Sequence, residues 1–427
     1  MDWTLATLAV ALLVFAALSG RLDGTPVTSA MVFVAVGLLV GPEALGLLEL
    51  SSHGEPVKLL AEATLTVVLF ADASRIDLRA LRREIAIPAR LLGIGLPLTL
   101  VAGLVAAVVL FAGLAWPEAL LIAVILAPTD AALGQAVVSL PRLPSRVRQG
   151  LNVESGLNDG ICVPIFFIAL AIAEAEAGAI GDGAAVRLVF EQIGYGLVAG
   201  AAGGAAAAIA VRFARGHATV DAAWLQVAPL AGAALAYGIA AGIGGSGFIA
   251  AFSGGMVFGA LLRGGSHEVV YLLEESGAVL GALTFVVFGA VLLGPALGYL
   301  STAIVVYAVL SLTVVRMLPV AVALRGTGAR RPTVGFLGWF GPRGLASIVF
   351  AVLLEEGSEL PHEQTILVTI YVTVGLSVLA HGLTAAPLAE RYARWFESYA
   401  RDQQPATEAG PAPDLPLRRS HRARRPD

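Results

Sequence analysis

The chain has 427 residues, of which 57% are hydrophobic and 14% are charged, and its mean hydropathy is +0.83. About a quarter of the residues of a soluble domain are charged, so this composition excludes an ordinary soluble domain and indicates an integral membrane protein. The single cysteine, Cys162, excludes an intramolecular disulfide and a cysteine-rich metal site.

Thirteen apolar segments predict membrane-spanning helices, since about 20 apolar residues are needed to cross a bilayer. The predicted fold class is therefore an all-α polytopic membrane protein. Arg21 follows the first segment and no basic region precedes it, so we expect a spanning helix there rather than a cleaved signal peptide. In chain order the segments are Thr4–Leu18, Pro26–Leu48, Val57–Phe70, Ala89–Leu114, Leu120–Val138, Leu151–Ile172, Val186–Val211, Ala222–Ile243, Phe248–Leu262, Val269–Leu293, Ala296–Leu324, Val334–Leu354 and Thr365–Leu388.

Charges in the connections between these segments alternate in sign. Connections from odd-numbered to even-numbered segments are basic, as the positive-inside rule requires of cytoplasmic loops, and the other connections are acidic. The pattern predicts an N-terminus outside the cell and a C-terminus in the cytoplasm. The basic residues are Arg21, Arg75, Arg79, Arg82, Arg83, Arg142, Arg146, Arg148, Arg212, Arg215, Arg263, Arg325, Arg330 and Arg331. The acidic residues are Glu43, Glu55, Glu118, Glu174, Glu176, Asp182, Glu355, Glu356 and Glu359.

Residues 391–427 are expected to form a cytoplasmic, disordered tail. Beyond about Arg401 this segment is polar and rich in Pro and Arg, so it lacks the apolar side chains needed for a core. Its basic stretch from Arg418 to Arg425 favours contact with lipid headgroups over nucleic-acid binding.

Thirteen spans permit an inverted repeat in which spans one to six correspond to spans eight to thirteen. Pro128 interrupts the fifth span, and Gly341–Gly344, with the sequence Gly-Pro-Arg-Gly, interrupts its counterpart, the twelfth. Proline removes a backbone donor and clashes with the preceding turn, so it either kinks a helix or unwinds it. Because the two interruptions occur in matching spans, they predict a crossed pair of broken helices at a transport site.

Five charged residues from four spans lie at similar depths in the expected membrane. At 1.5 Å per residue, the distances from the cytoplasmic end are about 12 Å for Asp130 and Arg316, 14 Å for Arg343, 9 Å for Glu154 and 16 Å for Asp159. Acidic groups in membrane helices are costly and mark ion or proton pathways. We therefore expect these residues to share one site.

The side chains in this group are oxygen donors rather than His or Cys. Ser155 and Asp159 are four residues apart and share a helix face, and an unwound backbone at Thr129 would add a carbonyl. Such ligands suit a small cation and not a transition metal. Glu154 and Arg316 are expected to form a structural ion pair. Arg343 would either balance charges at the break or serve in helix contacts.

Asp159 is the predicted exchange group. Partial burial raises a carboxyl pKa and a bound cation lowers it, so a proton and a cation compete for one carboxylate. The alternative is a neutral Asp159 that is only hydrogen-bonded to Asn158. His381, in the last span, is expected to be a helix-contact histidine rather than a pH sensor.

At these residues the chain resembles the monovalent cation/proton antiporters, in particular their electroneutral NhaP-like and NHE-like branch. The matching motifs are Thr129-Asp130, then Glu154-Ser155 followed by Asn158-Asp159, and three features further on. These are the glycine-rich stretch Ser246–Gly259, Arg316, and Gly341–Gly344. An Asn before the Asp is typical of the electroneutral branch. Gly156 departs from many relatives, which carry a larger residue there.

The resemblance implies an NhaA-like fold, a homodimer and an elevator motion. It implies a dimerisation part at about 1–72 and 222–293, a core part at about 87–172 and 296–388, and a linker helix at about 186–211. Asp159 would carry the exchange, with Asp130, Thr129 and Ser155 around the ion and Asn158 in support. No cofactor is expected besides the transported cation, Na⁺ first and Li⁺ or K⁺ as alternatives, and the proton.

Three other functions remain open at the level of sequence. Electrogenic exchange and a passive cation channel would use the same acidic residues. An intramembrane enzyme is disfavoured because Ser155 and Asp159 have no His or Lys nearby in the sequence to activate a nucleophile.

Overall fold

The computed structural model describes residues 3–22, 25–76, 86–130, 133–134, 137, 140–179, 181–217, 221–262, 269–357, 360–399 and 404–410. Sequence predictions for Arg79, Arg82, Arg83, Arg263, Glu359 and the stretch from Arg418 to Arg425 lie outside these residues.

The described residues form helices joined by turns and loops. The first group is α1 (Thr4–Leu22), α2 (Ser29–Val40), α3 (Glu55–Ser74), α5 (Ala86–Arg90), η1 (Leu91–Gly95), α6 (Leu96–Leu110), α7 (Trp116–Ile125), α9 (Ser145–Glu176) and α10 (Asp182–His217). The second is α11 (Ala222–Leu225), α12 (Val227–Gly242), α13 (Gly247–Leu262), α14 (Tyr271–Val287), η2 (Phe288–Leu293), α15 (Gly294–Ala296) and η3 (Leu297–Tyr299). The last is α16 (Thr302–Leu312), α17 (Val314–Ala323), α18 (Arg331–Trp339), α19 (Leu345–Gly357), α20 (Glu363–Glu397) and α21 (Ala406–Ala409).

Seven helical stretches among the described residues are long and apolar enough to cross a membrane. They are α1, α5 to α6, α9, α10, α14 to η3, α16 to α17, and α20. A polytopic all-helical membrane protein is thereby confirmed. At least one helical element lies in each of the thirteen predicted segments, but the number of crossings stays a prediction.

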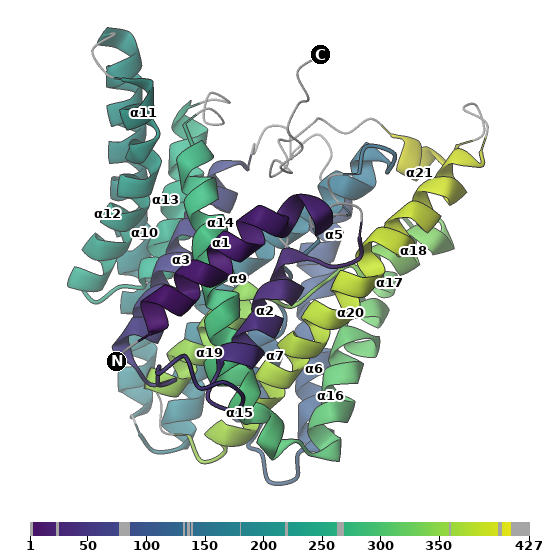
Figure 1. Ribbon diagram of the computed structural model, residues 1–427, viewed down its shortest axis with the longest axis horizontal. Helices are drawn as coiled ribbons and strands as arrows, with labels where there is room; N and C mark the ends of the chain where they lie inside the picture. Colours follow the sequence, from purple (N-terminus) through teal and green to yellow (C-terminus); the bar gives the residue numbers. More distant parts are fainter. Residues whose placement is uncertain are drawn as a thin grey trace.

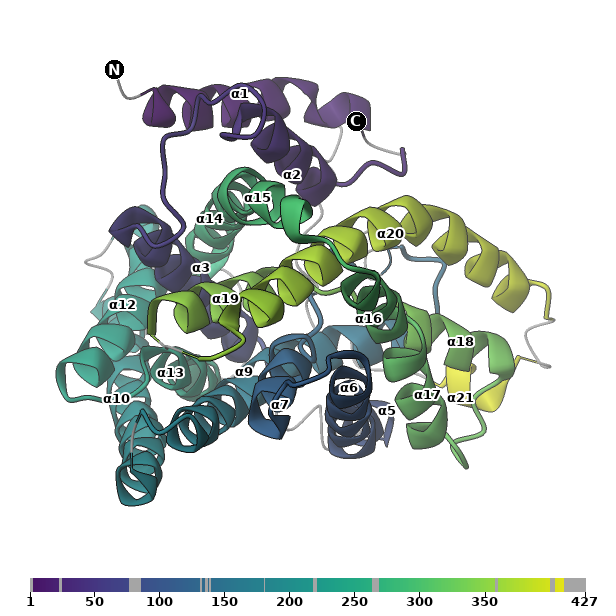
Figure 2. The same ribbon diagram turned by 90° about the horizontal axis from the view of Figure 1, so that it is seen from below.

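The helices form two groups joined by long central helices. In Figure 1, α10, α12 and α13 lie on one side of the molecule, and α16, α17, α18 and α20 lie on the opposite side. Figure 2 shows the same separation from below, with α9, α7 and α6 along one edge and α1 on the outer surface. Ala11 is the only residue of α1 that is buried, so this helix presents its apolar side chains outward.

Glycines set the close contact between α10 and α13. A Cβ atom added to Gly204 would overlap the Gly254 carbonyl, and one added to Gly200 would overlap Ser253. Only glycine lets two helix backbones approach so closely. The glycine-rich stretch 246–259 therefore serves helix contact in this fold.

The expected tail boundary at residue 390 is wrong for the described part of the tail. Helix α20 continues to Glu397, and α21 lies against the start of α18 (Figure 1). Glu408 is 1% exposed, and its carboxylate accepts hydrogen bonds from Thr333 Oγ1 (2.5 Å) and Arg330 N (2.9 Å). This contact could not be predicted from composition, because the contact depends on one buried carboxylate and not on apolar residues.

Candidate functional site

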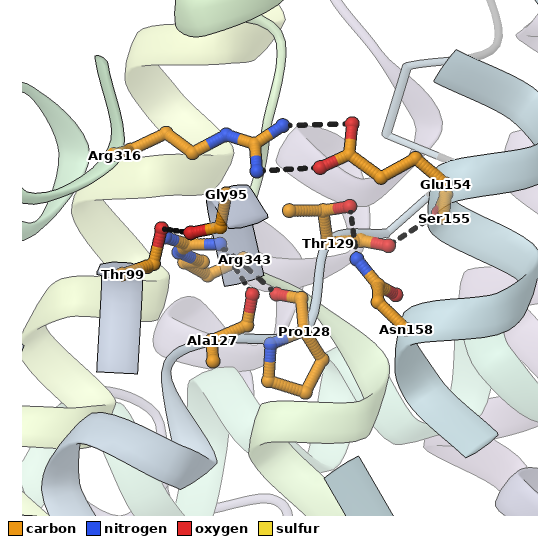
Figure 3. A network of polar contacts seen from close by, with 10 residues as sticks. All are labelled: Gly95, Thr99, Ala127, Pro128, Thr129, Glu154, Ser155, Asn158, Arg316 and Arg343. Atoms are coloured by element: carbon orange, nitrogen blue, oxygen red, sulfur yellow. Dashed lines mark hydrogen bonds and ion pairs between the residues drawn. The ribbon is translucent and has the colours of Figure 1, made fainter. Parts of the chain in front are cut away.

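The first interruption follows α7, which ends at Ile125. Residues 126–130 leave the helix around Pro128, so the carbonyl groups there need partners from elsewhere. Ser347 Oγ donates to the Ile125 carbonyl at 2.7 Å, and Arg343 Nη1 donates to the Ala127 carbonyl at 2.8 Å and the Pro128 carbonyl at 3.3 Å. Figure 3 shows the Arg343 contacts. The unwound segment 126–130 is thus held by side chains of the second broken helix.

The second interruption separates α18 from α19 at residues 340–344 and lies against the first. The Pro342 carbonyl accepts a hydrogen bond from Asp130 N at 2.7 Å, and Asp130 Oδ2 accepts one from Leu345 N at 2.9 Å. Leu345 begins α19, so the carboxylate sits at the positive end of that helix. Gly344 is required there because a Cβ would overlap the Asp130 carboxylate.

Thr129 joins the first interruption to α9. The Ser155 hydroxyl donates to the Thr129 carbonyl, and Asn158 Nδ2 donates to Thr129 Oγ1 at 2.7 Å. All three residues are buried. Figure 3 shows their side chains converging on one point between the helices. The four-residue spacing of Ser155 and Asp159 places the Asp159 carboxylate on the same face of α9, where it is 8% exposed.

Glu154 and Arg316 form a buried ion pair between α9 and α17. Arg316 Nη1 and Nη2 donate to the two carboxylate oxygens of Glu154, at 2.6 and 2.9 Å, and each side chain is 3% exposed (Figure 3). A Cβ on Gly341 would lie 2.5 Å from Arg316 Nε. The pair therefore connects the helix that carries Ser155 to the second interruption.

Asp72 on α3 is a further acidic group near α9 that sequence analysis missed. A Cβ placed on Gly156 would lie 3.8 Å from Asp72 Cβ, so the small residue at 156 lies beside Asp72 where α3 and α9 pack together. Asp72 falls just beyond the predicted third span, whereas α3 continues to Ser74. Extending that span by one turn would have included Asp72 in it.

The structure brings the sequence-predicted residues together from distant parts of the chain. Asp130, Thr129, Ser155 and Asn158 are linked through the first interruption, and Arg343 joins it to the second. Oxygen atoms and compensated charges at two unwound segments can hold a small cation. The transport role of each residue stays a prediction.

A profile described as "Sodium/hydrogen exchanger, transmembrane" matches residues 8–391. This chain belongs to that family.

Two relatives in the family carry antiporter names. A K⁺/H⁺ antiporter NhaP of Alkalimonas amylolytica is 28% identical over 404 residues, covering 92% of this chain and 66% of the relative. A Na⁺/H⁺ antiporter NhaP of Pseudomonas aeruginosa is 29% identical over 353 residues, covering 77% of this chain and 79% of the relative. The chain spans less than two thirds of the length of the first of these relatives.

A solved structure shares the fold. The sodium proton antiporter MjNhaP1 from Methanocaldococcus jannaschii, at pH 8, superposes with a TM-score of 0.74 at 22% sequence identity. The match covers 91% of this chain and 98% of that chain. The predicted resemblance to the NhaP-like branch is confirmed.

Proposed function

We propose that this family member exchanges a monovalent cation for a proton across the membrane, by competition of the two for Asp159. The observation that carries the proposal is the junction of two interrupted helices, where the Thr129 carbonyl and the Ser155 hydroxyl lie one helical turn from a mostly buried Asp159. Oxygen donors of this kind bind alkali cations. A proton and a cation cannot occupy one carboxylate together.

The other charges at the site have different roles in the proposal. The charge of Glu154 is neutralised by Arg316, and the Asp130 carboxylate accepts a hydrogen bond from Leu345 N at the N-terminus of α19. Asp159 then exchanges one positive charge for another, which makes the exchange electroneutral with one cation for one proton. Asp72, facing Gly156 across the α3–α9 contact, adds a second acidic group on the approach to the site.

Sodium is the first cation to test, with K⁺ and Li⁺ beside it, because the relatives are named for both Na⁺/H⁺ and K⁺/H⁺ exchange. In proteoliposomes that carry a pH-sensitive dye, addition of the cation should dissipate a preset pH gradient. Asp159→Asn should abolish this response. Glu174→Gln on the same helix α9 is the matched control and should exchange normally. Full exchange in Asp159→Asn would overturn the assignment.

Electrogenic exchange and a passive channel predict different outcomes in the same vesicles. A potential-sensitive dye that responds during exchange would favour an electrogenic antiporter. Cation flux that does not saturate and does not move protons would favour a channel. An electroneutral antiporter gives saturable exchange when the membrane potential is clamped at zero.

We also propose the family's architecture for this chain: thirteen spans in an inverted repeat, N-terminus outside, C-terminus in the cytoplasm, in the cell membrane. A homodimer would form through the part at about 1–72 and 222–293, and the core part would move. The contacts of α10 with α12 and α13 and with α9 support its role as the linker helix. Crosslinking in native membranes tests the dimer.

A further inference from the structure

One face of α20 lies against the second interruption. Ser377, His381 and Thr384 follow each other at spacings of four and three residues, so their side chains line the same side of the helix. Each of them makes a hydrogen bond with residues 339–343. The contacts of Ser377 and His381 are to backbone groups at the break, where intrahelical partners are lost, and the contact of Thr384 is to the Trp339 side chain.

His381 holds the end of α18. Its Nε2 lies 2.9 Å from the carbonyl of Trp339, the last helical residue before the break, and its ring stacks on the Trp339 ring with centroids 5.0 Å apart. Trp339 Nε1 donates to Thr384 Oγ1 at 2.9 Å. The Trp339 carbonyl also accepts a hydrogen bond from Gly341 N at 2.8 Å, so it is shared between the break and α20. Because His381 is 1% exposed, water cannot replace the imidazole from that side.

Ser377 holds the other end of the break. Its hydroxyl oxygen accepts a hydrogen bond from Arg343 N at 2.7 Å and lies 3.2 Å from His381 Nδ1. Nδ1 also lies 3.0 Å from the Ser377 carbonyl of its own helix. With the ring proton on Nε2, the ring donates to the Trp339 carbonyl and the Ser377 hydroxyl can donate to Nδ1. The two ends of the break are therefore connected through a single serine and histidine.

The segment between these two anchors carries the groups that orient Asp130. The Pro342 carbonyl accepts from Asp130 N, and the next helix begins at Leu345, whose amide donates to the Asp130 carboxylate. We propose that Ser377 and His381 are positioning residues for the cation site, and that they act on Asp130 through the backbone of the second interruption. This inference rests on the proposed exchange function.

A histidine that served only as a space-filling helix contact would be replaceable by phenylalanine, which keeps the ring stack on Trp339. A positioning histidine would not be, because Phe lacks the donor for the Trp339 carbonyl. Glutamine places an amide nitrogen where Nε2 lies and keeps that donor. The pair His381→Phe and His381→Gln thus separates the two roles.

The test is cation-driven proton exchange by the full chain in proteoliposomes, with initial rates at several Na⁺, Li⁺ and K⁺ concentrations. His381→Phe and Ser377→Ala should raise the apparent KM about tenfold, the effect of one lost backbone contact at a buried site, with a smaller change in the maximal rate. His381→Gln should stay within about threefold of wild type. Thr373→Val is the control, since Thr373 is buried on α20 and bonds only to the Thr369 carbonyl of its own helix.

Outcomes separate this inference from the proposed function. Wild type that exchanges none of the three cations overturns the proposed function itself. Wild type that exchanges, with Asp159→Asn inactive and both His381→Phe and Ser377→Ala equal to Thr373→Val in KM, overturns the positioning role alone. A lower melting temperature with an unchanged KM also overturns it. If His381→Phe yields no folded protein, Ser377→Ala decides by the same comparison, because it leaves the ring stack in place.

Discussion

The two interruptions differ in what surrounds them. Residues 126–130 are contacted by Ser155 and Asn158 from the helix that carries Asp159, whereas residues 339–343 are contacted by Ser377 and His381 from α20. The first segment presents the Ala127, Pro128 and Thr129 carbonyls, and the second presents the Pro342 carbonyl together with the amide and guanidinium groups of Arg343. In the proposed function the first break supplies ligands and the second supports them, so substitutions at the two should fail in different ways.

The largest effect is expected from the ion pair that lies between the breaks. Arg316→Met leaves the Glu154 carboxylate buried without its partner, which costs about 3–5 kcal/mol of folding free energy. We expect a large fall in the melting temperature of the purified protein, measured by thermal unfolding in detergent. The double variant Glu154→Gln with Arg316→Met removes both charges and should recover most of the loss. An Arg316→Met protein as stable as wild type would contradict the buried pair.

Gly344→Ala should disturb the contact between the two breaks. The new Cβ meets the Asp130 carboxylate, so either α19 or Asp130 must move, and exchange should fall by more than about tenfold, the effect of about 1.4 kcal/mol. Gly335→Ala on α18 is the matched control, because a Cβ there has open space around it. Equal exchange by the two variants would show that Asp130 tolerates displacement.

Ser155→Ala tests the ligand side of the comparison. Removal of the hydroxyl leaves the Thr129 carbonyl without its α9 donor, a loss of about 1 kcal/mol that corresponds to roughly a fivefold rise in the cation KM. The melting temperature should change little. Ser74→Ala is the control, since the buried Ser74 hydroxyl bonds to the Ala71 carbonyl of its own helix. A lower melting temperature with a normal KM would show that Ser155 supports the backbone and does not contribute to cation binding.

The smallest effect is expected outside both breaks, at the exposed Arg142. Its guanidinium group donates to Glu397 and Glu390, and the hydrogen bond to Glu397 lowers the pKa of that carboxyl. A lowered folded-state pKa adds stability above the unfolded pKa of about 4.3 and loses it as the pH falls through the folded value. Arg142→Ala should therefore be slightly less stable than wild type at neutral pH and equal to it in acid, as thermal unfolding at several pH values would show. The difference should also shrink at high salt.

Sequence patterns predicted the two interruptions because proline and glycine report directly on the backbone. Pro128 and the Gly-Pro-Arg-Gly run mark where helices end, and depth counting brought Asp130, Glu154 and Arg316 to one level. The hydrogen bonds between the interruptions depend on a crossing that no local pattern encodes. Ser377 and His381 look like ordinary side chains of an apolar helix, and only the positions of the Arg343 amide and the Trp339 carbonyl give them partners across the break.

Pro164 lies inside the predicted sixth span, and α9 runs unbroken through it from Ser145 to Glu176, because a proline can be accommodated where neighbouring helices support the freed carbonyl. One difference comes from the limits of hydropathy. Asp72 was outside the predicted third span because a charged residue ends an apolar run by composition, although the helix continues beyond it.

The docked segment at 404–410 offers a labelling position beside the second broken helix. Glu408 is bonded to Thr333 and to the amide at the start of α18, and Arg146 Nη1 of α9 donates to the Thr407 carbonyl at 3.1 Å, so both helices hold the segment. A fluorescent label attached through a cysteine at the exposed Ala409 would lie next to these anchors. Energy transfer from it to a label on α12, at the other side of the molecule, would then follow displacement of the broken helix in real time.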